Sequence, residues 1–142
     1  MTKVTFEPFT EACEQKLQFA VIVARFKDKW VFVRHNKRNT FEIPGGSREL
    51  HEKILFTARR ELFEETGART FRLTPVCVYV VSKAGVELGR GLLCYSEIVD
   101  LGELPPFEIS SVHLLDGIPE SLTYPDIQPY LFHKIQEWLH GN

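Results

Sequence analysis

Residues 46–68 read GSRELHEKILFTARRELFEETGA, and this stretch decides the fold. Gly46 follows Gly45, and paired glycines permit backbone conformations that other residues avoid. The apolar residues that follow recur at helical spacing. Gly67 is a common residue just past the end of a helix. The pattern therefore predicts a turn followed by a helix over about 52–66.

The predicted helix gathers three carboxylates at its C-terminal end. Glu61, Glu64 and Glu65 are spaced i, i+3 and i+4, which places them within an arc of roughly 100°. Like charges at this spacing repel one another and destabilise a helix. A bound hard cation would relieve the repulsion, because such ions prefer carboxylate oxygens. The alternative interpretation is a solvated acidic face.

The same helix has two apolar sides. One comprises Ile54, Leu55, Ala58 and Leu62, and the other comprises Phe56 and Phe63. A helix with one apolar face packs on one neighbour. Two apolar sides predict a helix wedged between layers, with its acidic edge facing a cleft.

The rest of the chain alternates apolar runs with polar turns. Residues 1–16 predict an edge strand or an arm. Further strands are expected at 17–26, 30–34, 76–81, 92–99 and 112–115, with a glycine-rich connection over 83–91 and a final helix over about 127–140. The first two of these form a hairpin. This order favours an α+β layered fold over a doubly wound parallel sheet, and 142 residues favour one domain, 1–142.

Composition narrows the function. The net charge is −2, which argues against a duplex nucleic acid partner. The three cysteines are far apart and lack CxxC spacing, so neither disulfides nor zinc are indicated. The N-terminal residues lack the apolar segment of a signal peptide, and no run approaches membrane-spanning length. We therefore expect a cytoplasmic protein that has no membrane partner.

The stretch 46–68 resembles the Nudix box, Gly-x5-Glu-x7-Arg-Glu-U-x-Glu-Glu-x-Gly-U, where U is apolar. The matching residues are Gly46, Glu52, Arg60, Glu61, Leu62, Glu64, Glu65, Gly67 and Ala68. The preceding Phe41–Gly46 segment resembles the strand-Pro-Gly-Gly entry of that family. One departure is His51, at a position where many members carry glycine.

The resemblance implies a Nudix-type α/β/α sandwich with a mixed sheet. It also implies hydrolysis of a nucleoside diphosphate linked to a second group, assisted by Mg²⁺ or Mn²⁺. The metal ligands by resemblance are the carboxylates of Glu61, Glu64 and Glu65 and the carbonyl of Gly46. Arg60 is expected to orient carboxylates, pairing with Glu64 and with Glu52.

The general base is expected to be Glu64 or Glu65. Glu103, on a proline-flanked loop, is the first alternative outside the box. Two further alternatives are Glu97 and Glu108. Expected substrate contacts come from Gly45, Gly46 and Arg34, the last of which ends a strand pointing toward the glycine turn.

Family resemblance suggests a small-molecule nucleotide substrate. The leading hypothesis is a nucleoside triphosphate, such as the oxidised nucleotide 8-oxo-dGTP, cleaved to the monophosphate and pyrophosphate. ADP-ribose, other nucleotide sugars and dinucleoside polyphosphates remain alternatives, as does a nucleotide-sensing domain without turnover. The protein is expected to be a monomer or a homodimer.

Overall fold

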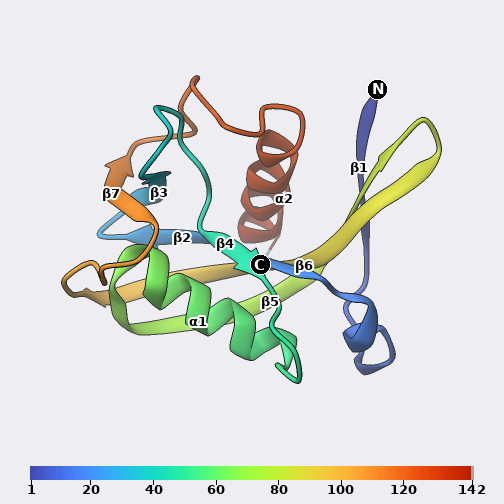
Figure 1. Cartoon of the computed structure of the whole chain (residues 1–142), viewed down its shortest axis with the longest axis horizontal. Helices are drawn as coiled ribbons and strands as arrows, with labels where there is room; N and C mark the ends of the chain where they lie inside the picture. The colour runs from blue at the N-terminus through green and yellow to red at the C-terminus, as the bar shows by residue number, and fades with distance from the viewer. Residues whose placement is uncertain (142) are drawn as a thin grey trace.

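The computed structural model describes residues 1–141, apart from the side chain of Ser110. Within these residues the chain forms two α-helices, a short 3-10 helix and seven strands (Figure 1). In chain order they are β1 Thr2–Glu7, η1 Glu11–Lys16, β2 Phe19–Phe26, β3 Lys29–His35, β4 Gly45–Ser47, α1 Ile54–Thr66, β5 Ala68–Lys83, β6 Val86–Leu101, β7 Ile109–Leu115 and α2 Gln128–His140.

The strands form one mixed sheet, as predicted. Its order is β1-β5-β6-β2-β3-β7, with β4 paired to β2 beside that path. Strands β2 and β6 run parallel, whereas the other pairs are antiparallel. The N-terminal segment is the predicted edge strand, β1.

The two helices pack on opposite faces of this sheet. The side chains of β2 pack alternately in two hydrophobic cores, one on each face of the sheet, because successive side chains of a strand point to opposite faces. Ile22 packs in the cluster that contains Leu62 of α1, while Val23 packs in the cluster that contains Leu131 of α2. Figure 1 shows the sheet between the two helices. The predicted α/β/α sandwich is therefore confirmed.

Helix α1 ends where the sequence predicts. Gly67 adopts a left-handed conformation (φ 79°), and its N–H donates to the carbonyl of Phe63. The helix starts at Ile54, two residues later than expected. The prediction of a helix wedged between two layers is wrong, because Phe56 is 58% exposed. Phe63 is only half-buried, with the guanidinium of Arg69 over its ring.

Strands β5 and β6 are much longer than predicted. They meet at a tight turn, Ala84-Gly85, where both residues have positive φ, as the two-residue turns of twisted hairpins require. The region 86–91 is therefore strand, and the expected connection over 83–91 is wrong in extent. Gly89 and Gly91 belong to β6, and a Cβ at Gly91 would lie 2.7 Å from the hydroxyl of Tyr79.

Strand β2 changes its antiparallel partner along its length. Phe19–Val21 pairs with β4, whereas Arg25 and Phe26 pair with β3. Strands β3 and β4 thus leave β2 in different places, but the segment between them stays bonded to both neighbours. Glu42 pairs with Val33 of β3, and the Pro44 carbonyl accepts the Ile22 N–H. Glu42, Ile43 and Gly45 line a cleft, which is the candidate site.

Candidate active site

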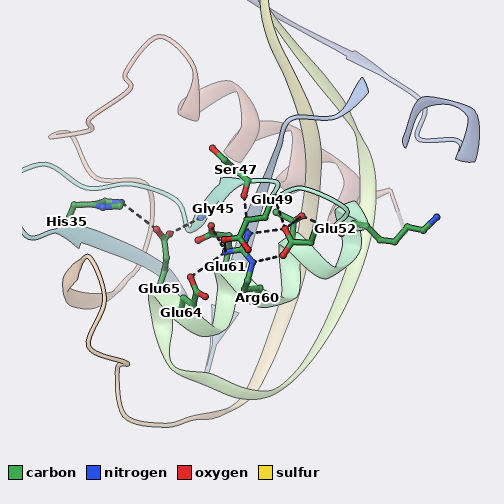
Figure 2. Close-up of polar contacts among 11 residues, drawn as sticks. His35, Gly45, Ser47, Glu49, Glu52, Arg60, Glu61, Glu64 and Glu65 are labelled. Atoms are coloured by element: carbon green, nitrogen blue, oxygen red, sulfur yellow. Dashed lines mark hydrogen bonds and ion pairs between the residues drawn. The ribbon is translucent and has the colours of Figure 1, made fainter. Parts of the chain in front are cut away.

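Arg60 organises the acidic end of α1. Its Nε donates to Glu52 Oε2 at 2.6 Å and its Nη2 to Glu52 Oε1 at 3.0 Å, a bidentate pair of the kind that guanidinium and carboxylate groups favour. Nη2 also donates to the carbonyl of Ser47 at 3.0 Å. Arg60 thereby ties the loop before α1 to the helix itself (Figure 2).

The remaining guanidinium nitrogen of Arg60 faces two box carboxylates. Nη1 lies 3.1 Å from Glu61 Oε2 and 3.4 Å from Glu64 Oε1. Glu64 and Glu52 were both expected partners of Arg60, and the shorter contact is with Glu52. The reason is that Glu52 is itself fixed, since it accepts hydrogen bonds from the Glu49 N–H and the Thr57 hydroxyl.

Glu65 is buried one turn further along α1 than Glu61. Its Oε1 accepts the Gly45 N–H at 2.9 Å, so α1 is joined to β4. Burial, with a smaller contribution from the nearby Glu61 and Glu42, raises the pKa of Glu65 to about 8, although the Gly45 hydrogen bond acts in the opposite direction. The protein holds this carboxylate where its charge is incompletely balanced.

Glu61 lies between Arg60 and Gly46 of β4, where the sequence predicts a turn but the structure has a strand paired to β2. Burial raises its pKa to about 6 in spite of the neighbouring Arg60. A Cβ at residue 46 would lie 2.1 Å from Glu61 Oε2, so only glycine allows this close approach. The Gly46 backbone and two carboxylates with raised pKa values, those of Glu61 and Glu65, therefore converge.

This arrangement fits a divalent cation. A cation would offset the charge of Glu61 and Glu65, and the oxygen donors around Gly46 are of the type that Mg²⁺ and Mn²⁺ prefer. Within residues 1–141, however, no three acidic, His or Cys side chains already surround a single point. Arg60 Nη1 instead contacts both Glu61 and Glu64.

A second charged cluster, which the sequence analysis missed, adjoins Glu65. His35 Nε2 lies 3.2 Å from Glu42 Oε1 and 3.5 Å from Glu65 Oε2. Glu42, only 7% exposed, also accepts from Arg38 Nη1 at 2.8 Å. A signal existed in the sequence, because Glu42 is flanked by Phe41 and Ile43, and alternation points it away from their face.

Arg34 and His35 project differently. By strand alternation Arg34 shares a face with Phe32, whose ring lies near Phe132 of α2, whereas His35 reaches Glu65 on α1. Among the described residues, His35 and Arg38 line the cleft at this site and Arg34 does not. The prediction for Arg34 relied on strand order and had no information about side-chain direction.

The three acidic residues considered outside the Nudix box, Glu97, Glu103 and Glu108, lie in different parts of the structure. Glu103 is exposed, and its backbone packs on the end of α1, where a Cβ at Gly67 would lie 2.6 Å from its carbonyl oxygen. Glu97 contacts Arg25, with 3.5 Å between Oε1 and Nη2. Of the three alternatives, only Glu108 lines the cleft among the described residues.

The cleft has a volume of about 750 Å³ and crosses from α1 to α2. Its acidic wall contains Glu61 and Glu65 of α1, and Gln128 and Leu131 of α2 also line it. The apolar residues of the lining include Val21, Ile43, Tyr79 and Val81. A polar reactive end thus adjoins an apolar chamber, as is usual for ligand sites.

None of the helices that the structure describes has the length and apolar character needed to cross a membrane.

The acidic helix α1 lies directly beside the paired glycines of β4 in an α/β/α sandwich. This arrangement defines a class of protein that is also recognised by similarity to known proteins. The NUDIX domain family model matches residues 14–87, just over half of the chain. The chain therefore belongs to the Nudix family.

Individual relatives agree. YtkD of Bacillus subtilis (strain 168), described as a candidate 8-oxo-dGTP diphosphatase, is 33% identical over 104 residues. The match covers 72% of this chain but only 64% of YtkD, less than two-thirds of that protein. The B. subtilis pyrophosphohydrolase BsRppH has a similar crystal structure, with a TM-score of 0.77 and 25% identity over 96% of this chain and 91% of its own.

More distant structures share the fold alone. A Nudix hydrolase from Nitrosomonas europaea has a TM-score of 0.68 at 21% identity, covering 99% of this chain and 89% of its own. An Ap4A hydrolase from C. elegans has the same TM-score at 14% identity, covering 88% and 100%.

Proposed function

We propose that this protein hydrolyses a nucleoside triphosphate to the nucleoside monophosphate and pyrophosphate. One observation carries the proposal: Glu61 and Glu65 are held in the cleft wall beside the Gly46 backbone, with raised pKa values and incomplete charge balance. The metal ion of a metal-bound diphosphate would balance the charge of these carboxylates, and phosphoryl transfer depends chiefly on positioning and on neutralising charge.

We propose Mg²⁺ as the cofactor, with Mn²⁺ as the alternative. Glu61, Glu64, Glu65 and the Gly46 carbonyl would hold it. When bound, the cation supplies Lewis-acid activation of the diphosphate and neutralises negative charge.

The chain's own residues orient the reaction. Arg60, anchored on Glu52 and Ser47, keeps the box carboxylates beside the glycines of β4. Gly45 fixes one oxygen of Glu65. We assign the removal of a proton from the attacking water to Glu64 or Glu65, with Glu103 retained as the alternative from the sequence.

The apolar chamber supports a nucleoside substrate. The acidic wall and the α2 residues are separate parts of the cleft lining. The phosphate chain of a nucleotide would contact the first, and its base would contact the second. The similarity to YtkD and to the pyrophosphohydrolase BsRppH supports cleavage of a phosphoric anhydride. 8-oxo-dGTP is therefore the first substrate to test.

The experiment is a nucleotide panel with Mg²⁺, following phosphate and pyrophosphate release. We expect pyrophosphate from a nucleoside triphosphate, and a loss of about 100-fold or more in kcat for Glu65→Gln and Glu64→Gln. Glu137→Gln, the same change at an exposed position of α2, is the control and should retain full activity.

Unchanged turnover in both box variants would overturn the assignment of the metal and the base. Tight Mg²⁺-dependent nucleotide binding without release of either product would instead favour a sensing domain.

A further inference from the structure

The start of α1 is capped by a residue from a distant part of the chain. The first N–H groups of a helix lack backbone partners, and a polar side chain just before the helix usually accepts one of them. Within the described part of the chain, the side chain of Lys53, which holds this position, makes no such bond. The Ile54 N–H instead donates to Glu14 Oε2 at 2.7 Å. Glu14 belongs to η1, 40 residues earlier in the sequence.

Arg48 fixes Glu14 in this position. Its Nη1 donates to the Glu14 carbonyl at 3.0 Å and lies 3.4 Å from Glu14 Oε2. Its Nη2 donates to the carbonyl of Gln15 at 3.0 Å, and its backbone N–H donates to the carbonyl of Gln18 at 2.8 Å. Both charged side chains are largely enclosed, with Glu14 16% and Arg48 20% exposed. The connection between β4 and α1, residues 48–53, is therefore bound to the N-terminal part of the chain.

The far side of the same connection is bound to the candidate active site. Glu52, near its end, forms the bidentate pair with Arg60, and Arg60 also holds the carbonyl of Ser47 just before its start. The third guanidinium nitrogen of Arg60 contacts Glu61 and Glu64. A shift of the first turn of α1 against the connection would therefore move Arg60 relative to Glu52, and with it the box carboxylates.

We propose that Glu14 is a positioning residue for the metal site. By accepting the Ile54 N–H, its carboxylate sets the start of α1 against the connection and keeps Glu61, Glu64 and Glu65 at their spacing beside Gly46. The inference rests on the proposed function for the use of Mg²⁺ by these carboxylates. It adds a residue that lies outside the Nudix box and does not touch the substrate.

The test measures the affinity for Mg²⁺ by calorimetry, below the melting transition of every variant. Glu14→Ala removes the acceptor and should weaken Mg²⁺ binding by about tenfold, the usual effect of losing an outer partner of a metal site. Glu14→Gln keeps an oxygen that accepts the Ile54 N–H and should retain most of the wild-type affinity. Turnover of 8-oxo-dGTP should follow the same order, with kcat falling and KM little changed.

Two control variants separate positioning from stability. Glu11→Ala removes an exposed carboxylate from the same short helix and should leave Mg²⁺ binding unchanged. Ile135→Val lowers stability in the core on the other face of the sheet, so it should lower the melting temperature without changing the Mg²⁺ affinity of the folded protein. Equal affinity in wild type and Glu14→Ala would overturn the inference. An equal loss in Glu14→Ala and Glu14→Gln would also overturn it, because glutamine keeps the acceptor.

Hydrogen exchange in the wild-type protein tests the same link without any variant. Coupling between two sites is reciprocal, so a cap that strengthens Mg²⁺ binding about tenfold must itself be strengthened about tenfold by Mg²⁺. Saturating Mg²⁺ should slow exchange of the Ile54 N–H by that factor relative to the Ile135 N–H of α2. Equal slowing at both amides would overturn the inference.

The outcomes also separate this inference from the proposed reaction. Failure to hydrolyse any triphosphate, together with weaker Mg²⁺ binding by Glu14→Ala, would overturn the reaction and support the positioning role. Hydrolysis with the same dependence on Mg²⁺ in wild type and Glu14→Ala would overturn the positioning role alone.

Discussion

At the scale of single residues, the pairing of Arg60 with Glu52 is the main restraint on the acidic helix. Glu52 is almost fully enclosed, with its side chain 7% exposed, and both of its oxygens accept from the guanidinium. Hydrogen bonding by Arg60 lowers the pKa of Glu52 to about 2. The pair therefore links the stability of the site to pH.

We predict that Glu52→Gln lowers the free energy of unfolding by about 2 kcal/mol near neutral pH, the usual value for a buried charge-assisted hydrogen bond. The folded pKa of about 2 lies below the ordinary value of 4.5. A depressed pKa stabilises the fold above the ordinary value, and this stabilisation is lost as the pH falls through the folded value. The difference between wild type and variant should therefore shrink between these two pH values.

Urea denaturation across that pH range measures the difference. Glu137→Gln, at an exposed position, is the control and should show little change at any pH. A difference that stays constant down to the folded pKa would contradict the linkage.

His51 shows the cost of departing from the family pattern. It adopts a left-handed backbone with φ 67°, the conformation that glycine accepts without strain. We predict that His51→Gly raises the free energy of unfolding by about 0.5–1 kcal/mol, since relief of strain exceeds the added freedom of the unfolded chain.

Thermal and urea unfolding would measure this gain. His133→Gly, at an exposed helical position of α2, should instead lower stability by about 1 kcal/mol. A loss of stability in both variants would contradict the account of strain at His51.

At the scale of elements, α1 is held by one face. Ile54, Ala58 and Leu62 are fully buried, whereas Phe56 lies on the surface. We predict that Leu62→Ala lowers the free energy of unfolding by about 3 kcal/mol. Phe56→Ala should change it by less than about 1 kcal/mol, because little apolar area returns to water.

The two variants serve as each other's control in the same denaturation experiment. An equal loss in both would restore the interpretation of α1 as a helix packed between two layers.

Much of this could be predicted because the decisive signals are local. The end of α1 at Gly67 and the crowding of Glu61 and Glu65 follow from spacing along one helix. The exposure of Phe56 could not be predicted, since nothing in helical periodicity states whether a second layer exists. The sequence also could not predict that Gln128 accepts a hydrogen bond from the Ile43 N–H, because Ile43 is distant in sequence and is brought near only by the packing of α2.

At the scale of the whole molecule, the acidic wall should make stability respond to divalent cations. A ligand that binds only the folded state adds about 2.7 kcal/mol at one hundred times its dissociation constant. We therefore predict that saturating Mg²⁺ raises the melting temperature by roughly 5–10 °C. Differential scanning calorimetry with and without a chelator would measure the shift.

Glu65→Gln should lose most of this shift, because it removes a proposed ligand, and Glu137→Gln should retain it. A shift of the same size in wild type and Glu65→Gln would argue that the cation binds elsewhere.

The change of partners along β2 has a consequence for how this protein can vary. Phe19–Val21 pairs with β4 while Arg25 and Phe26 pair with β3, so one strand anchors both elements between which Glu42 and Ile43 line the cleft. The segment that carries these two residues is itself bonded to β3 at Val33 and to β2 at Ile22. Substitutions that strengthen these junctions would gain rigidity by holding the cleft lining in one position. Robustness and substrate range are therefore coupled through β2, and variation with the least effect on either should accumulate elsewhere, such as at the far tip of the β5–β6 hairpin.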